Sequence, residues 1–373
     1  MLSAITLALW VMALARTLHN LSSVRRLQRG DMPEQASLIS VVIPARNEQR
    51  AIEATVRAHL LSSYPNFEVI VVDDRSEDGT AEVLERLGDW RLVVIRGEET
   101  PAGWLGKPWA LHQGAQRARG SLLLFADADV HYEPEALGAA AAHLLRSDAA
   151  LITLFPQMEM KTFWERVLMP TLGLTLFVYL PLWLSNRTRW HRLAVGGGTG
   201  NLVRRDRYEN AGGHQALKDA VVDDVGLARL IRIHGDRTEA VRAEDLVSLR
   251  MYHGLREIVQ GFTKNIFAAC GRNYAVALAL AVLGILFHVV PYFLALTGDR
   301  LAVATVVVIS IIRVVLFRAL GYGLANALFL HPLGVTVWTW ILIRSTWMTG
   351  IRRQLEWRGR TYDAQKTRFG ADR

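Results

Sequence analysis

The chain has 373 residues, of which 51% are apolar and 21% are charged, and its formal net charge is +8. It contains a single cysteine, Cys270, which excludes an internal disulfide framework. A basic chain can bind nucleic acid, but much of this surplus charge flanks apolar segments, which is typical of the cytoplasmic side of membrane proteins. We therefore expect a membrane partner and no nucleic acid. The flanking basic residues are Arg16, Arg25, Arg26 and Arg29 near the start, and Arg352, Arg353, Arg358, Arg360, Lys366 and Arg368 near the end.

The first element is an apolar segment over residues 2–15, which is shorter than an average membrane span. Arg16 can snorkel toward the headgroups, and His19 and Leu21 can extend the helix. Because no basic side chain precedes the segment, we predict an uncleaved transmembrane anchor over residues 1–22 rather than a cleaved signal peptide.

Strands and helices then alternate along an ordinary soluble composition. β-Branched and apolar runs predict strands over 38–44, 67–72, 91–95 and 121–126. Helical spacing predicts helices over 48–61, around 83–87 and from 107 to 118, and Pro134 suits the first turn of the next helix. This alternation predicts an α/β domain with a mostly parallel sheet, in which ligands bind beyond the carboxyl ends of the strands.

Two apolar regions follow. Residues 167–184 are long enough to cross a membrane, but a crossing would separate Asp129 from Asp224, so we expect an interfacial or re-entrant helix. Residues 275–297 form a good span, and 301–343 hold apolar length for one or two more, interrupted by Arg313 and Arg318. A cytoplasmic tail over 349–373 then requires an even number of crossings within the membrane domain 275–348, most simply two.

Asp127-Ala128-Asp129 follows the predicted strand 121–126. Two carboxylates at this position can hold a divalent cation against a nucleotide diphosphate, although such pairs also occur in polar turns. Four other motifs share the sheet edge or follow it, and their joint order is more specific than any one of them. They are Pro44-Ala45-Arg46-Asn47-Glu48, Val72-Asp73-Asp74-Arg75-Ser76-Glu77-Asp78-Gly79-Thr80, Gly106-Lys107-Pro108-Trp109-Ala110-Leu111 and Val222-Asp223-Asp224.

In this order the motifs resemble those of family 2 glycosyltransferases, over roughly residues 38–265. The resemblance implies a GT-A, Rossmann-like catalytic domain, which we place at 36–265. The C-terminal apolar region and the tail Trp357-Arg358-Gly359-Arg360-Thr361-Tyr362 look most like the bacterial hopene-associated subgroup. That subgroup is related to ceramide glucosyltransferases and carotenoid glycosyltransferases.

The resemblance also implies roles for individual residues. Donor binding falls to Pro44, Arg46, Glu48, Asp74, Lys107 and Asp127. Asp129, with Asp127, would hold Mg²⁺ or Mn²⁺, and Asp224 would be the general base, preceded by Asp223 where the family usually has Glu. The alternatives are ordinary structural roles: acids in a helix first turn for Glu48, Asp223 and Asp224, a turn former for Asp74, and a solvated lysine for Lys107.

The run Gly196-Gly197-Gly198-Thr199-Gly200-Asn201 invites interpretation as a dinucleotide loop, but basic residues 187–192 precede it rather than a buried strand. We interpret Gly198, Thr199 and Gly200, with Asp223, as the acceptor side of the site, where missing side chains let a sugar approach the backbone. The family motif Gln-x-x-Arg-Trp is absent, which argues against a processive polysaccharide synthase. Lys264 is the candidate replacement for its arginine at the diphosphate, with a juxtamembrane lysine as the alternative.

The sequence thus predicts a membrane-anchored, metal-dependent, inverting glycosyltransferase of a cell inner or plasma membrane. It would use a nucleotide sugar, with a UDP-sugar as first candidate, and a lipid-like acceptor on the cytoplasmic face. A polyprenyl-phosphate sugar synthase and a non-catalytic sugar-nucleotide binding protein are the alternatives. His214 and His253 are expected to be structural or solvated.

Overall fold

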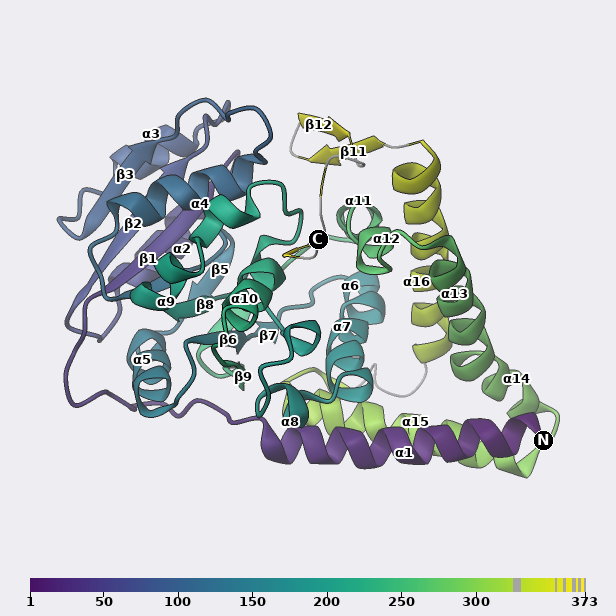
Figure 1. The fold of residues 1–373 in the computed structure, drawn as a ribbon. Helices are drawn as coiled ribbons and strands as arrows, with labels where there is room; N and C mark the ends of the chain where they lie inside the picture. Colours follow the sequence, from purple (N-terminus) through teal and green to yellow (C-terminus); the bar gives the residue numbers. More distant parts are fainter. Residues whose placement is uncertain (325–329, 353, 358–359, 364–366, 368–369, 372–373) are drawn as a thin grey trace. The chain divides into compact units, whose positions relative to one another are not determined.

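The computed structural model describes residues 1–324, 330–352, 354–357, 360–363, 367 and 370–371 (Figure 1). The chain forms two compact units. We call them the sheet unit (Val24–Gln157, Leu184–Arg250 and Thr367–Arg373) and the helical unit (Met1–Ser23, Met158–Trp183 and Met251–Lys366). Each unit has a buried apolar core of its own.

A seven-stranded sheet with the order β3-β2-β1-β4-β8-β6-β9 forms the centre of the sheet unit. Strands β3, β2, β1 and β4 are parallel, β8 is antiparallel to both of its neighbours, and β6 and β9 are parallel. The mostly parallel α/β sheet is therefore confirmed. Its strands are β1 (Ile39–Ala45), β2 (Phe67–Asp73), β3 (Leu92–Arg96), β4 (Leu122–Phe125), β6 (Leu151–Phe155), β8 (Asn201–Arg204) and β9 (Thr238–Arg242).

Strand β1 shows how sequence and register agree. Its apolar residues are buried, as expected for a central strand between two neighbours. Pro44 nevertheless lies within it, because pairing with β4 ends at the partners Val42 and Phe125. The proline therefore follows the last β4 pair, where no ladder hydrogen bond to β4 is required of its backbone nitrogen.

Helices pack on this sheet, with α4 lying along β1 and β2 (Figure 1). The α-helices of the sheet unit are α2 (Ile52–Leu60), α3 (Thr80–Glu85), α4 (Gly106–Arg117), α5 (Ala136–Arg146), α9 (Arg205–Asn210) and α10 (Asp223–Ile233), with 3₁₀ turns η2 (His191–Leu193) and η3 (Gly213–Leu217). A small second sheet has the order β5-β10-β7, with β5 (Val130–Tyr132), β10 (Val247–Leu249) and β7 (Gln157–Met158).

Three helix predictions were wrong in detail. The helix predicted from residue 48 begins at Ile52, and backbone N–H groups of the preceding segment donate to side chains of another loop, for example Glu48 N to Thr80 Oγ1 at 2.9 Å. Leu87 lies beyond the end of α3, and Pro134 lies before α5 rather than in its first turn. The loop that ends β1 is thus held by side chains and not by helical hydrogen bonds.

The linker after the first helix is also held. Arg26 forms a bridge to Arg242 at the sheet edge, and Leu27 N donates to the Arg242 carbonyl at 2.8 Å. The Arg26 guanidinium forms ion pairs with Glu244, at 3.1 Å, and with Asp245. Part of the basic cluster that we interpreted as a marker of the cytoplasmic side is therefore also used within the sheet unit.

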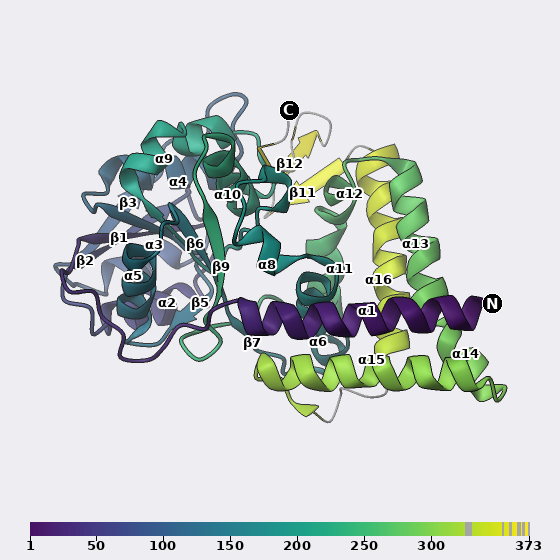
Figure 2. The same ribbon diagram turned by 60° about the horizontal axis from the view of Figure 1, so that its bottom comes forward.

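The helical unit contains two helix pairs, α1 with α15 and α13 with α16, which lie side by side in both views (Figures 1 and 2). Within the described residues, three helices are long and apolar enough to cross a membrane: Leu2–Ser23, Tyr274–Leu296 and Arg300–Ala319. Ser3 Oγ donates to Asp299 Oδ2 at 2.5 Å, so α1 and α15 begin at the same end and run in the same direction. The helices are α1 (Leu2–Ser23), α11 (Leu255–Thr263), α12 (Ile266–Ala269), α13 (Tyr274–His288), α14 (Val290–Leu296), α15 (Arg300–Ala319), α16 (His331–Ser345) and η5 (Thr346–Ile351), followed by the hairpin β11 (Gln354–Trp357) and β12 (Arg360–Asp363).

The apolar segment 167–184 is broken into short pieces: α6 (Phe163–Leu168), α7 (Pro170–Leu174), the π-helix η1 (Thr175–Tyr179) and α8 (Leu182–Ser185). Pro170 lies at the start of α7, and Pro181 lies directly before α8. The amide of Asn20, on α1, donates to the carbonyls of Phe177 and Leu180, both at 2.8 Å. These bonds satisfy carbonyl groups where the helix is interrupted, which an apolar environment requires.

Candidate active site

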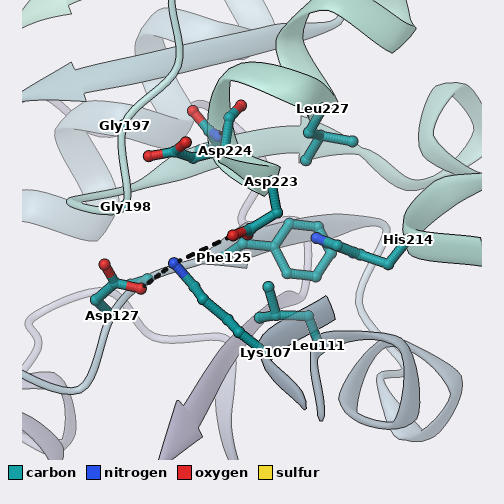
Figure 3. Close-up of a pocket in the computed structure, with 12 residues that line it drawn as sticks. Lys107, Leu111, Phe125, Asp127, Gly197, Gly198, His214, Asp223, Asp224 and Leu227 are labelled. Carbon is teal, nitrogen blue, oxygen red and sulfur yellow. Dashed lines mark hydrogen bonds and ion pairs between the residues drawn. The ribbon is translucent and has the colours of Figure 1, made fainter. Parts of the chain in front are cut away.

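A small pocket opens at the carboxyl end of β4 in the sheet unit (Figure 3). The carboxyl ends of the strands are the position expected for a ligand site in a parallel sheet. The elements that line the pocket are distant in sequence. The lining residues are Lys107 and Leu111 of α4, Phe125, Ala126 and Asp127 at the end of β4, Gly197, Gly198 and Asn201 around the start of β8, His214 of η3, and Asp223, Asp224 and Leu227 of α10.

One lysine joins two of the acidic groups. Lys107 Nζ lies 2.7 Å from Asp127 Oδ1 and 3.4 Å from Asp223 Oδ1 (Figure 3). The lysine side chain is 17% exposed. Burial alone would lower the pKa of Lys107, but the carboxylates of Asp127, Asp223 and Asp224 outweigh burial and raise it. The pocket therefore contains a permanent positive charge among three carboxylates.

The surroundings of Lys107 favour its charged form, whereas those of the two acids of α10 favour the neutral form by raising the pKa of each carboxyl. Burial raises the pKa of Asp223 and of Asp224, the Lys107 charge opposes this, and the nearby carboxylates raise both further. Both residues lie in the first turn of α10, where the helix dipole favours negative charge. The two acids are therefore a helix-terminal acidic pair, as the structural alternative predicted. From this position both also line the pocket.

The glycine run lies between these acids. Asp127 N donates to the Gly198 carbonyl at 2.8 Å. A Cβ on Gly198 would collide with the Asp127 carboxylate, and a Cβ on Gly196 would collide with the backbone of Asp224. The missing side chains therefore allow the strand end of Asp127 and the helix start of Asp224 to approach the same loop. We expected glycine here for the approach of a sugar, and close packing within the protein is a sufficient reason.

Two polar pocket residues were not predicted as site residues from the sequence. His214 is 1% exposed, and its Nδ1 lies 2.9 Å from the hydroxyl of Tyr208. Burial, with smaller effects of Lys107 and His112, lowers the pKa of His214 to about 3, so the imidazole is neutral. The structural role expected for His214 is correct, but its place in the pocket is not visible in a lone histidine. Asn201 had only its position after the glycine run as a signal.

Four of the six predicted donor residues group elsewhere on the same sheet edge, and only Lys107 and Asp127 lie in the pocket lining. Arg46 Nη1 donates to the carbonyls of Asp74, at 2.6 Å, and Arg75, at 3.2 Å, while Arg46 Nη2 pairs with Glu77 at 3.2 Å. Asp74 is 5% exposed, and its N–H donates to Ala45. The loops after β1 and β2, which carry Pro44, Arg46, Glu48 and Asp74, are therefore joined, but these residues do not line the pocket of Figure 3.

Four other predicted residues also lie outside that lining. Thr199 is buried, and its hydroxyl donates to the Leu154 carbonyl at 2.6 Å, so this side chain serves the packing of its loop. Gly200 follows in the same loop, and Asp129 precedes β5. Lys264 caps the C-terminal end of α11, in the helical unit.

Comparison with known proteins assigns part of the chain to a family. The sequence profile described as "Glycosyl transferase family 2" matches residues 40–210. Residues 40–210 form a family 2 glycosyltransferase domain. The predicted family and the GT-A fold are thereby confirmed.

Two known proteins resemble this glycosyltransferase over most of its length. The 4,4'-diaponeurosporenoate glycosyltransferase of Staphylococcus aureus (strain USA300) is 25% identical over 343 residues, which cover 88% of this chain and 89% of the relative. The solved mannosyltransferase PcManGT from Pyrobaculum calidifontis, in complex with GDP-Man and Mn²⁺, is similar with a TM-score of 0.56 and 19% identity, over 95% of this chain and 100% of that chain. The second likeness shows a shared fold.

A divalent cation suits the residues of this glycosyltransferase domain only if the ligand brings part of its coordination. Within the part of the chain that the structure describes, no three His, Cys, Asp or Glu side chains converge on one point. Asp127 and Asp129 nevertheless provide carboxylate oxygens, and Mg²⁺ in nucleotide sites commonly binds one or two carboxylates together with phosphates and water. The residues fit a hard cation that arrives with a nucleotide diphosphate.

Proposed function

We propose that the protein is an inverting glycosyltransferase that transfers a sugar from a nucleoside diphosphate sugar to the hydroxyl of a lipid-like acceptor. A UDP-sugar is the first candidate donor, and we place the reaction at the cytoplasmic face of a cell membrane. One observation carries the proposal: Lys107, Asp127, Asp223 and Asp224 line one pocket at the carboxyl end of the sheet of a glycosyltransferase domain (Figure 3).

Each charged group of the pocket has a role in this reaction. Asp224 accepts the proton of the acceptor hydroxyl while its oxygen attacks the anomeric carbon from the side opposite the diphosphate, so a single displacement inverts the configuration. The Lys107 ammonium, fixed beside Asp127, balances negative charge that a diphosphate brings. A bound Mg²⁺ or Mn²⁺, with Asp127 and Asp129 as its protein ligands, supplies Lewis-acid stabilisation of the leaving diphosphate.

The remaining predicted residues surround this centre. In the proposal, the joined loops that carry Pro44, Arg46, Glu48 and Asp74 hold the nucleoside. The glycine loop with Gly198, Thr199 and Gly200, together with Asp223, forms the acceptor side, and Lys264 approaches the diphosphate. The structural neighbour with GDP-Man supports testing guanosine donors beside uridine donors.

Two observations support a lipid-like acceptor. The relative from Staphylococcus aureus acts, by its name, on a carotenoid acid. Three apolar helices of this chain have the length and composition of membrane spans. The resemblance to the hopene-associated subgroup adds hopanoids to the acceptors worth testing.

The acceptor group decides between the proposal and its main alternative. A hydroxyl must lose a proton to attack, whereas a phosphate or a carboxylate attacks without a general base. We expect Asp224→Asn to lower transfer to a hydroxyl acceptor by about 10²- to 10⁴-fold with unchanged donor binding. Asp206→Asn is the matched control, since Asp206 is also a helix first-turn acid but is exposed on α9.

The assay is release of the nucleoside diphosphate from a panel of UDP- and GDP-sugars, with native membrane lipid extract as the acceptor. Full activity of Asp224→Asn would favour a polyprenyl-phosphate or carboxylate acceptor. If the wild-type protein released no diphosphate with any donor in Mn²⁺ or Mg²⁺, the non-catalytic binding protein would be the better description.

The direction of the helices supports the proposed orientation in the membrane. Because α1 and α15 begin at the same end, residues 274–296 must carry the chain to that end before α15 returns. In the proposal, the chain crosses the membrane twice after residue 275, and Arg25 and the tail lie on one, cytoplasmic, side, where α1 ends.

Labelling of single cysteines in intact cells tests this orientation. The cysteine near the first basic cluster is placed at the exposed Gln28. Gly30 is unsuitable because its φ of 78° would strain a cysteine. We expect Gln28→Cys and Gln365→Cys, each in a Cys270→Ser background, to resist an impermeant maleimide until the cells are lysed. Modification of either one in intact cells would contradict the proposed orientation.

A further inference from the structure

We propose that Asn201, itself held by Thr153, is a positioning residue that fixes the first turn of α10 and thereby the carboxylate of Asp224. The catalytic part of this inference rests on the proposed function. The structural part concerns the hydrogen bonds of three residues in the sheet unit and can be tested without an activity.

The three residues form one hydrogen-bonded chain. Asn201 Nδ2 donates to the backbone carbonyl of Asp224 at 3.0 Å, and Asn201 Oδ1 accepts from Thr153 Oγ1 at 2.8 Å. Asn201 begins β8 and is 2% exposed, while Thr153 lies in β6 and is fully buried. The chain therefore connects two strands of the central sheet to the helix that carries Asp224.

Hydrogen-bonding chemistry allows only one orientation of this chain. A backbone carbonyl can only accept, so the NH₂ of Asn201 must face Asp224. The amide oxygen then faces Thr153, whose hydroxyl must donate. That hydroxyl also lies 3.0 Å from the Val195 carbonyl, so its one proton is shared between two buried acceptors. Removing the hydroxyl leaves both acceptors without this donor.

The start of α10 has no capping side chain at its N-cap residue, which is Val222. Within the first turn, the Asp224 carboxylate accepts a hydrogen bond from Val225 N at 2.7 Å. The glycine at position 196 lets the loop before β8 pass close to the Asp224 backbone, where any side chain would collide. Asn201 therefore contacts this first turn from β8, at a carbonyl rather than at the N–H groups that an N-cap would satisfy.

This placement matters for a base more than for packing. A general base acts only within hydrogen-bond reach of the proton it removes, and a displacement of about 1 Å can cost about 10²-fold in rate. Asn201 acts through the backbone of Asp224, so its loss should affect the chemical step and leave donor binding by Asp74, Lys107 and Asp127 unchanged. A merely structural asparagine would instead lower thermal stability without a selective effect on kcat.

Three variants of the full-length protein separate these possibilities. Asn201→Ala removes the contact to Asp224. Thr153→Val keeps the shape of Thr153 but removes the hydroxyl, and Thr153→Ser removes a methyl group but keeps the hydroxyl. Steady-state rates are measured with the most active donor of the UDP- and GDP-sugar panel, with Mn²⁺ and membrane lipid extract. Hydrogen–deuterium exchange of the peptide that covers residues 222–228 is measured in parallel.

We expect Asn201→Ala and Thr153→Val to lower kcat by about 10- to 100-fold with an unchanged donor KM. Both should raise the exchange rate at the start of α10, and Thr153→Ser should behave as wild type in both measurements. Unchanged exchange in Asn201→Ala and Thr153→Val would overturn the inference, as would equal losses in the two Thr153 variants. If the wild-type protein had no activity, the proposed function would fail, and the exchange measurement would still decide whether Asn201 holds α10.

Discussion

The sheet unit and the helical unit both bury polar side chains, but they satisfy them differently. In the sheet unit, charged groups pair directly: Lys107 with Asp127 and Asp223, and Arg119 with Glu68. In the helical unit, hydrogen bonds connect Tyr179 to His288, His288 to His331 and His331 to Arg313, at 2.5, 3.0 and 3.3 Å. Each of these four side chains comes from a different helical element.

The donors and acceptors in the hydrogen-bonded series of the helical unit follow from the chemistry of Arg313. A guanidinium can only donate, so Arg313 donates to His331 Nδ1 and leaves a proton on Nε2, which donates to His288. His288 Nε2 then donates to Tyr179. In this way one cation orders two imidazoles and a phenol. The rings of Trp10, on α1, and His288 are arranged edge to face, with their centroids 4.9 Å apart. In the sheet unit, the paired charges of Lys107, Asp127 and Asp223 line a pocket, whereas the polar chain of the helical unit connects helices.

The largest expected effect is the loss of activity on removing a carboxylate of the sheet unit. We expect Asp129→Ala to lower activity by about 10³-fold, because the nucleotide-bound cation loses a ligand. The melting temperature should change little, since Asp129 is only half-buried. Asp148→Ala, at an acid that is 86% exposed, is the control. Wild-type turnover that persists in metal-free buffer with a chelator would contradict this role.

The sequence predicts β1, β2, β3 and β4 because each is an apolar run of strand length, and it gives no prediction for β6, β8 and β9. It also predicts that acids at the carboxyl ends of the predicted strands lie near one another. It does not predict the start of α2, where the segment before the helix is hydrogen-bonded to a loop about 30 residues away. Nor does it predict the environment of Asn201, whose partners lie 23 and 48 positions away. Single-residue signals fail where the deciding contacts are long-range.

The next largest effect is expected in the core of the helical unit. Phe177 is 1% exposed, and its carbonyl accepts from Asn20. Phe177→Ser should lower the free energy of unfolding by about 3–5 kcal/mol, because it leaves a cavity and buries a hydroxyl. Thermal unfolding in detergent measures this. Wild-type stability of the variant would show that segment 175–179 is not part of the core of its unit.

The buried carboxylate of Glu68, in the sheet unit, should affect how the free energy of unfolding depends on pH. Glu68 is 3% exposed and accepts from Ser40 Oγ at 2.6 Å and from Arg119 N at 2.8 Å. Burial alone would raise the pKa of Glu68, but these bonds and the Arg119 charge outweigh it and lower the pKa below 4.5. A carboxyl whose pKa is lower in the folded state stabilises the fold above pH 4.5, and this contribution is lost as the pH falls toward its folded pKa.

We therefore expect Glu68→Gln to cost about 1–3 kcal/mol near pH 7 and to reduce the loss of stability below pH 4.5. Denaturant unfolding between pH 3 and pH 7 checks this. Glu53→Gln is the control, since Glu53 is exposed and pairs only with Arg57 on its own helix. Equal acid sensitivity of Glu68→Gln and wild type would mean that other carboxyl groups govern the transition.

The smallest effect concerns the surface of the same apolar segment. Leu176 is half-buried, whereas its neighbour Phe177 is buried, so the two positions separate a role in lipid binding from a role in packing. If the segment guides a lipid acceptor, Leu176→Ser should lower use of a long-chain acceptor by a few-fold, about the loss of one apolar side-chain contact. Metal-dependent hydrolysis of the nucleotide sugar needs no lipid and should not change. Phe177→Ser should instead lower both activities together with stability. If Leu176→Ser also lowered both in parallel with its melting temperature, the whole segment would be core, and acceptor guidance would have to come from another part of the chain.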